Sequence, residues 1–272
     1  MADSEIATSP QRKPHVGEME GGGAHLQAVT MAAGTDARRF ELSRFPASLR
    51  QTARIVSTFL AMTGWRPGHL NLVWALGGAS SIALAHVLIS LGDWRLTLPY
   101  FLFTVLFYYG GNTAILSSRI PARLVARLGE DRAFRAYETV LGIMFLNQGL
   151  GVGCMSTLPE GLIPLPRAPL LVAGALMFGL GLVVKLWATL VVGVDIFYYR
   201  DMFVGRALGP ICHGGPYRFL RNPMYGLGQV QAYGYALLYC SSTGLLAAAT
   251  GHFLIYVFYL LVERSFVRRI HA

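Results

Sequence analysis

Six long apolar stretches lie between residues 70 and 262 of this 272-residue chain, and they limit what it can fold into. A helix that crosses a bilayer needs about 20 apolar residues, and most of these stretches meet that requirement. Hydrophobic residues make up 54% of the chain and charged residues 14%, whereas a soluble domain carries about 25% charged residues. We therefore expect an integral membrane protein. The stretches are residues 70–91, 96–116, 139–158, 168–192, 225–240 and 244–262.

These stretches predict an all-α polytopic membrane protein with about six transmembrane helices, or five if the shortest does not cross. The shortest, residues 225–240, is rich in glycine. The uncharged residues 240–243 that follow it permit only a tight reversal of the chain. We therefore expect residues 225–262 to form a C-terminal helical hairpin.

Positive charge alternates between the connections, which predicts the orientation of the chain. Cytoplasmic loops of membrane proteins carry an excess of Lys and Arg. Three connections hold only Arg95, only Arg167 and no basic residue, while the others each hold several arginines. Both termini and the long loop of residues 193–224 are therefore expected to face the cytoplasm. Contact of these arginines with anionic lipid headgroups accounts for the net charge of +9, and no nucleic-acid-binding motif accompanies it.

The N-terminal part divides into two segments. Residues 1–45 are polar and rich in glycine, so they are expected to be a disordered cytoplasmic tail. Residues 46–66 place apolar side chains at helical spacing with Arg50 and Arg54 between them. This pattern predicts an amphipathic helix on the membrane surface, or the ordinary start of the first span. Residues 67–166 then form transmembrane helices 1–3, and residues 167–272 form a functional core.

The connection before the hairpin is dense in polar and aromatic residues, which a simple linker does not need. Its residues 213–228, HGGPYRFLRNPMYGLG, resemble the G-x-Y-x-x-x-R-[HN]-P-x-Y-x-G signature of membrane methyltransferases that use S-adenosylmethionine. That superfamily includes phosphatidylethanolamine N-methyltransferases and isoprenylcysteine carboxyl methyltransferases. The carboxyl methyltransferases usually have His where this chain has Asn222. The run from Asn222 to Tyr225 is instead similar to the N-P-M-Y of the phospholipid N-methyltransferases.

The resemblance covers about residues 170–270 and implies an S-adenosylmethionine site. It places Asp201 on the family's aspartate and a G-x-G on Gly179 and Gly181. The family has a Glu-Glu pair at the cytoplasmic end of the last span, whereas this chain has Glu263 followed by Arg264. The cofactor-binding residues that we expect are Gly179, Gly181, Tyr217, Arg221, Asn222, Pro223, Tyr225 and Glu263.

The chemistry of methyl transfer explains why such residues are useful. Tyrosine faces and a carboxylate attract a sulfonium or ammonium cation. The substrate amine must lose a proton before it attacks, so Asp201 and Glu263 are the predicted catalytic residues. Arg218 and His213 are the predicted substrate-binding residues, since a guanidinium fork suits a lipid phosphate. Lys185 lies inside an expected span and is expected to extend to the cytoplasmic headgroups. The three cysteines lack metal-ligand spacing, so no metal site is expected.

We therefore predict a methyltransferase that acts on the amino headgroup of phosphatidylethanolamine or its mono- and dimethyl derivatives, toward phosphatidylcholine. Its site faces the cytoplasm, at the endoplasmic reticulum in a eukaryote or the inner membrane in a bacterium. Three alternatives stay open. They are an isoprenylcysteine carboxyl methyltransferase, a membrane reductase with a related C-terminal hairpin, and a degenerate, non-catalytic lipid-binding relative.

Overall fold

The computed structural model describes residues 47–66 and 71–271. The predicted tail, residues 1–45, lies outside this range. The chain divides into two units, Met1–Gln51 and Thr52–Ala272, and only the beginning of α3 (Ala47–Met62) is described in the first unit. Within the described residues the chain is helical and forms no β-strand, apart from an isolated bridge between Leu162 and Ser241. An all-α fold is thus confirmed for this part of the chain.

Four helices of the second unit are long and apolar enough to cross a membrane. Their outward side chains are largely apolar, and Leu72, Val73 and Leu76 of the first one are each more than 60% exposed. A helix surface of this kind is stable in lipid and not in water. The four are α4 (Leu72–Leu91), α8 (Glu130–Ser156), α9 (Arg167–Val192) and the continuous helix Ser242–Ile270, which contains α13 (Ser242–Phe258), η5 (Tyr259–Glu263) and most of α14 (Arg264–His271).

Two further expected spans are helical but irregular. Residues 94–116 form α5 (Trp94–Val105), a π-helical turn η1 (Leu106–Gly110) and α6 (Gly111–Leu116) in one run. Residues 227–238 form a 3₁₀ turn η4 (Leu227–Gln229) and the short α12 (Val230–Leu238). Neither segment is among the four helices that satisfy the length and hydropathy requirements, so the expected count of six spans is not established.

Local capping signals explain where several helices begin and end. The side chain of Asn71 accepts a hydrogen bond from the Trp74 amide at the start of α4, and Gly92 ends α4 in the left-handed conformation. Ser241 caps α13 by accepting from the Gly244 amide at 3.0 Å, directly after Cys240 with φ 51°. The expected tight reversal is therefore present, and α12 and α13 pack together as a helical hairpin.

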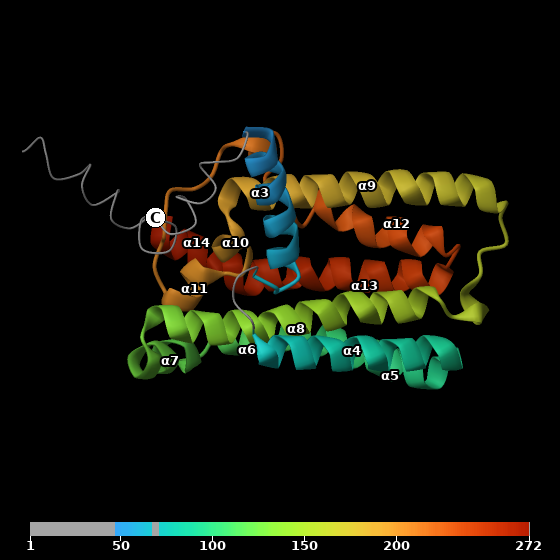
Figure 1. The fold of residues 1–272 in the computed structure, drawn as a ribbon, viewed down its shortest axis with the longest axis horizontal. Coiled ribbons are helices and arrows are strands. Elements are labelled where there is room, and N and C mark those ends of the chain that lie inside the picture. The colour runs from blue at the N-terminus through green and yellow to red at the C-terminus, as the bar shows by residue number, and fades with distance from the viewer. Residues whose placement is uncertain (1–46, 67–70, 272) are drawn as a thin grey trace, which may run out of the picture. The chain divides into compact units, whose positions relative to one another are not determined.

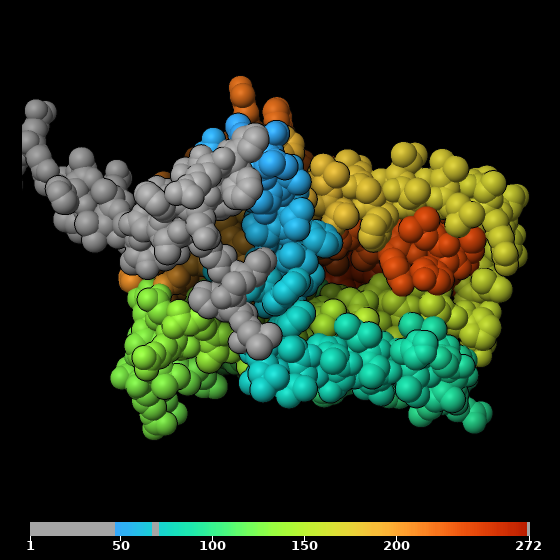
Figure 2. Space-filling view, in the orientation of Figure 1, coloured from blue at the N-terminus to red at the C-terminus, as the bar shows by residue number. Residues whose placement is uncertain are grey.

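The long helices run side by side in Figure 1, with α9, α12 and α13 on one side and α8, α4 and α5 on the other. Figure 2 shows atoms of α12 exposed between α9 and α8 on this face. The tightest contact joins α9 to α12, where Gly174 and Gly234 allow the two backbones to approach closely. A Cβ on Gly174 would lie 2.8 Å from the amide nitrogen of Leu238, so only glycine fits there.

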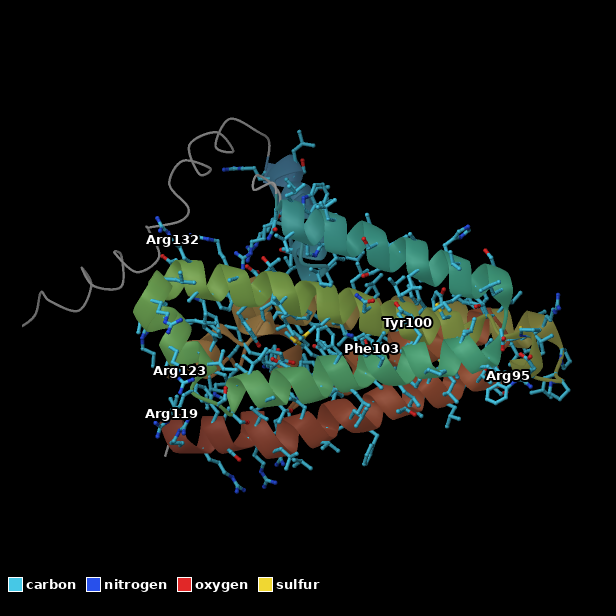
Figure 3. The ribbon with its side chains drawn as sticks, turned by 90° about the horizontal axis from the view of Figure 1, so that it is seen from below. Arg95, Tyr100, Phe103, Arg119, Arg123 and Arg132 are labelled. Carbon is cyan, nitrogen blue, oxygen red and sulfur yellow. The ribbon has the colours of Figure 1, made fainter. Side chains whose placement is uncertain are left out.

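One end of the bundle collects the short helices and much of the positive charge. The helices α7 (Ile120–Leu128), α10 (Val194–Phe197), α11 (Arg200–Val204) and α14 all lie at this end (Figure 1). Arg119, Arg123 and Arg132 lie at this end, whereas Arg95 lies at the opposite end (Figure 3). The charge asymmetry predicted from the sequence is thus an asymmetry between the two ends of the folded unit.

One sequence expectation about this bundle is wrong. Lys185 does not extend to the surface. It is only 7% exposed, and its Nζ donates a hydrogen bond to Oε1 of Gln229 at 3.3 Å. Because α9 packs closely against η4 and α12, these two elements cover the lysine side chain.

Candidate active site

A carboxylate and two tyrosines form the centre of a polar cluster at the end of the bundle that carries the short helices. The hydroxyl of Tyr225 donates to Oε2 of Glu263 at 2.7 Å. The hydroxyls of Tyr225 and Tyr199 lie 3.2 Å apart and share a hydrogen bond. Both tyrosines are buried, and Glu263 is half-buried in the last long helix, seven residues before Ile270. The structure therefore brings two predicted site residues, Tyr225 and Glu263, into direct contact.

Asp201 and Tyr217 border the same carboxylate. The Asp201 carboxylate lies close enough to Glu263 for their charges to repel. Burial raises the pKa of the Tyr217 phenol above its usual value, and the Cys212 thiol and the Glu263 carboxylate raise it further. Tyr217 therefore keeps its proton and stays a hydrogen-bond donor at neutral pH. Asp201, Tyr217 and Tyr225 are thus all near enough to Glu263 to interact with its charge.

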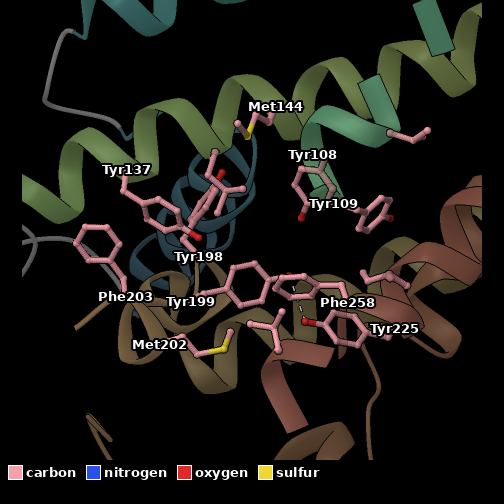
Figure 4. Packing of buried hydrophobic residues seen from close by; sticks show 14 of the residues in the cluster. Tyr108, Tyr109, Tyr137, Met144, Tyr198, Tyr199, Met202, Phe203, Tyr225 and Phe258 are labelled. Carbon is pink, nitrogen blue, oxygen red and sulfur yellow. Dashed lines mark hydrogen bonds between the residues drawn. The ribbon is translucent and has the colours of Figure 1, made fainter. Parts of the chain in front are cut away.

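Two π-helical turns supply side chains to the cluster. Glu263 is the last residue of η5, and η1 carries Tyr108 and Tyr109. A π-turn inserts one extra residue into a helix and turns the following side chains to a new face, which is why such turns are frequent at functional sites. Figure 4 shows Tyr108 and Tyr109 on the opposite side of the cluster from Tyr225, with Tyr199 and Phe258 between them. Aromatic rings therefore pack against Tyr225 and Tyr199 on one side of the site.

The N-P-M-Y segment is a folded turn rather than an open loop. Oδ1 of Asn222 accepts from the Tyr225 amide at 3.2 Å, and the Asn222 carbonyl accepts from the Gly226 amide at 3.0 Å. Pro223 is fully buried, and its carbonyl accepts from the Gly228 amide at 2.8 Å. The fixed φ of proline and the asparagine cap hold Tyr225 in the direction of Glu263. The contacts of Asn222 and Pro223 that are seen here are thus within the turn.

The two glycines of the expected G-x-G have different surroundings. A Cβ on Gly181 would overlap the backbone nitrogen of Gln231, so Gly181 is needed for the packing of α9 against α12. A Cβ on Gly179 would meet nothing within 4 Å. Helix packing accounts for Gly181 and leaves Gly179 without a packing reason. A cofactor role for either glycine stays a prediction.

The remaining predicted residues lie outside the hydrogen-bonded cluster. Arg218, Arg221 and His213 are exposed, and the guanidinium of Arg218 lies 5.9 Å from the centre of the Phe219 ring. Each belongs to the connection that contains η3 (Gly215–Arg218) and precedes η4. Their predicted contacts with cofactor or substrate stay predictions.

An ion-pair network fixes the beginning of this connection. Asp195 in α10 pairs with Arg66 at 2.5 Å and with Arg200 at 2.7 Å, and Arg66 also pairs with Glu138 of α8. Burial alone would raise the pKa of Asp195, but the hydrogen bonds and charges of Arg66 and Arg200 outweigh it and lower the pKa. Arg200 continues the network to Asp131 at 2.6 Å. Tyr199 and Asp201, on either side of Arg200, are thereby anchored to α8.

Tyr199 is the cluster residue that sequence reasoning missed. Its φ of 60° is unusual for a residue with a side chain, and this conformation starts α11 and directs the phenol to Tyr225. The signal in the sequence is its place in the connection that is dense in polar and aromatic residues, two residues before Asp201. Periodicity cannot reveal a single left-handed residue.

Fold and site together define an integral membrane protein with an acidic, tyrosine-lined site at one end of a helical bundle. Residues 170–272 match the family model of the phospholipid methyltransferases. The match contains nearly all of α9 and continues through α14, so it includes Asp201, Tyr225 and Glu263. The resemblance expected from the motif is thus confirmed, and this part of the chain is a methyltransferase-family domain. No curated protein and no solved structure is significantly similar to the chain.

Proposed function

We propose that the protein is an S-adenosylmethionine-dependent methyltransferase that methylates the amino headgroup of phosphatidylethanolamine or its mono- and dimethyl derivatives. The observation that carries the proposal is the contact between Tyr225 of the N-P-M-Y segment and Glu263, beside Asp201. This arrangement attracts a cation, and both the methyl donor and the lipid amine are cations. The family match of residues 170–272 supports the same reaction class.

The charges and aromatic rings of the cluster suit the proposed cofactor. S-adenosylmethionine, when bound, supplies a methyl group on a positively charged sulfur. Glu263 and Asp201 supply compensating negative charge, and the rings of Tyr217 and Tyr225 add cation–π attraction worth about 0.5–2 kcal/mol each. Gly179 leaves open space on the neighbouring helix. The residues we assign to cofactor binding are Gly179, Gly181, Tyr217, Arg221, Asn222, Pro223, Tyr225 and Glu263.

The chain itself then has to deprotonate, orient and enclose the substrate amine. We assign proton acceptance to the carboxylates of Glu263 and Asp201, because an ammonium has no lone pair with which to attack. The fixed Asn222–Pro223 turn helps to align the amine with the methyl group. In a direct displacement, an enzyme increases the rate mainly by holding the reacting atoms close together and in line. The surrounding tyrosines exclude water. Arg218 and His213, which lie in the connection that contains η3, are proposed to contact the lipid headgroup.

The proposed arrangement in the membrane follows from the two ends of the bundle. We propose that residues 96–116 and 225–240 complete six crossings, that both termini face the cytoplasm, and that the site opens on the same side. The arginines at the end of the bundle with the short helices support this orientation. We further propose a surface position for residues 46–66, spans 1–3 for residues 67–166, and a catalytic core for residues 167–272. An endoplasmic reticulum or bacterial inner membrane suits this topology.

The test uses the full chain in lipid nanodiscs with methyl-labelled S-adenosylmethionine. Phosphatidylethanolamine, its mono- and dimethyl derivatives and a prenylated cysteine are offered separately. We expect label in the three phospholipids, and we expect Glu263→Gln to lose it. Glu160→Gln is the matched control, because Glu160 is an exposed glutamate in η2 (Pro159–Gly161), outside the cluster.

The remaining outcomes separate the alternatives. Label on the prenylated cysteine alone would replace the proposed substrate by that of the carboxyl methyltransferases. Binding of a nicotinamide cofactor in place of S-adenosylmethionine would favour the reductase. Absence of any cofactor binding would favour a non-catalytic lipid-binding relative, in which Arg264 beside Glu263 is the departure from the family pattern.

A further inference from the structure

Lys185 is a buried cation that the proposed mechanism does not use. It lies one turn after Gly181 on the face of α9 that packs against η4 and α12, and it is 7% exposed. Its stem runs along Gly228, where an added Cβ would lie 3.3 Å from Cβ and 3.5 Å from Cε of the lysine. Gly228, three residues after Tyr225, therefore makes room for this side chain.

The charge of Lys185 has no acidic partner among the described residues. No carboxylate oxygen there lies within 4.0 Å of Nζ, and Gln229 offers a neutral oxygen at 3.3 Å. An ammonium has three donors, and a buried charge is stable only when it is paired. The neighbouring titratable group is His252, whose ring lies beside the backbone of Tyr225 and repels Lys185 when it is charged. This side of the motif turn is thus suited to an anion.

The other side of the same turn is suited to a cation. Tyr225 directs its hydroxyl to Glu263, while Gly228 and Gln229, three and four residues later, contact Lys185. One short segment therefore separates an acidic group from a basic group. A phosphoethanolamine headgroup carries the complementary pair, an ammonium and a phosphodiester two carbons apart.

Lys185 lies in the last third of α9, toward the end of the bundle that carries the short helices. At about 1.5 Å per residue the 26-residue helix is about 39 Å long, which exceeds a hydrocarbon core of about 30 Å. Lys185 precedes the last residue of the helix, Val192, by seven positions, or about 10 Å. Trp187 beside it is 44% exposed, and tryptophan is enriched at the interface where lipid phosphates lie.

We propose that Lys185, with Gln229 and His252 beside it, binds the phosphodiester of the lipid whose amine is methylated. The inference rests on the proposed function and adds to it a reason for phospholipid selectivity. A lipid amine without phosphate leaves the lysine uncompensated, whereas a phosphodiester supplies the missing negative charge. Lys185 is a binding residue in this account and takes no part in proton transfer.

The test compares two amine substrates in nanodiscs of the full chain. Phosphatidylethanolamine carries the phosphodiester, and sphingosine is a long-chain amine without it. Lys185→Met should raise KM for phosphatidylethanolamine about 10- to 100-fold, as expected for loss of a hydrogen bond to a charged group, and leave kcat nearly unchanged. KM for sphingosine and the Kd for S-adenosylmethionine should stay within about twofold. Lys185→Arg should keep most of the phospholipid affinity.

Thr189→Val is the control for helix packing. Thr189 is fully buried one turn further along the same face and donates to the Lys185 carbonyl at 2.9 Å. It should change neither KM. An equal rise of both values in Lys185→Met would overturn the inference, as would an unchanged KM for phosphatidylethanolamine. Weaker binding of S-adenosylmethionine would instead assign the lysine to the cofactor carboxylate and also overturn it.

Competition with the wild-type protein gives a result that needs no variant. Soluble glycerophosphoethanolamine should compete with phosphatidylethanolamine better than inorganic phosphate or ethanolamine does. Inorganic phosphate of equal potency would assign the site to free phosphate and contradict the lipid assignment. Failure of the proposed function has a different signature, because the wild-type protein would then methylate neither phosphatidylethanolamine nor sphingosine.

Discussion

The Tyr225 hydroxyl connects the Asn222–Pro223 turn to the Glu263 carboxylate through a 2.7 Å hydrogen bond. Tyr225→Phe removes that bond and keeps the ring. A hydrogen bond to a charged group is worth about 1.5–3 kcal/mol, so we expect S-adenosylmethionine to bind at least about tenfold more weakly. Calorimetric titration of the detergent-solubilised protein measures the change. Tyr239→Phe, at the exposed end of α12, is the control and should bind normally.

Asn222 has a structural role, as a cap of the turn, and a predicted role in cofactor binding. Its side-chain oxygen caps the Tyr225 amide, and loss of such a cap costs about 1 kcal/mol. Asn222→Ala should therefore lower the thermal unfolding midpoint and weaken cofactor binding together. Asn222→Asp keeps an acceptor oxygen and should restore the midpoint. Restored stability with cofactor binding still lost would show that the asparagine amide itself contacts the cofactor.

At the scale of the helix, glycine decides how closely α9 approaches α12. Gly181→Ala and Gly234→Ala would each place a methyl group against a backbone nitrogen of the other helix, that of Gln231 and that of Phe178. Overpacking of this kind costs about 1–3 kcal/mol, so both variants should unfold at lower temperature. Gly179→Ala meets open space and should keep or raise the unfolding temperature, since alanine favours a helix.

Cofactor titration of the same variants tests the expectation that the glycines of the G-x-G border the cofactor. If Gly179 borders the cofactor, Gly179→Ala weakens binding while the protein stays fully stable. Normal binding in that variant would remove Gly179 from the site. An unaltered unfolding temperature in Gly181→Ala would show that the α9–α12 contact is looser than the structure places it.

Sequence reasoning succeeded where the physical signal is local. Apolar runs predicted the helices, and the structure places Tyr225 of the motif in contact with Glu263, with the charge of Asp201 nearby. That these residues form the site stays a prediction. It failed where the outcome depends on a neighbouring helix. Lys185 was expected at the surface because nothing in its own segment shows that η4 and α12 cover it. The left-handed Tyr199 and the π-turns η1 and η5 are equally invisible to periodicity, because each shifts a single residue.

At the scale of the molecule, an ion-pair network connects segments that are far apart in the sequence. Arg66, which follows α3, meets Asp195 of α10 and Glu138 of α8, and Arg200 joins Asp195 to Asp131. No spacing rule predicts these pairs, because the loops and helices that bring them together are set by the packing of the whole bundle. The network holds the connection that carries Tyr199 and Asp201, so its integrity controls the geometry of the site.

The network predicts a specific loss of stability in acid. Arg66 and Arg200 lower the pKa of Asp195 below that of an aspartate in the unfolded chain, although burial opposes them. Above the unfolded pKa, about 3.9, both states are ionised and the stabilisation is complete. As the pH falls toward the lower folded pKa, the unfolded chain takes up its proton first, and the stabilisation is lost.

Asp195→Asn isolates this contribution from that of the other carboxylates. The variant should unfold at a lower temperature than the wild type at pH 7, and the difference should shrink as the pH falls from about 5 to 3. High salt should reduce the difference at pH 7, because these side chains are partly exposed and salt screens them. Thermal unfolding of both proteins in one detergent over this pH range is the measurement. Two parallel curves would mean that Asp195 has the same pKa in the folded and unfolded chains, and the network would then not be what holds the connection at the site.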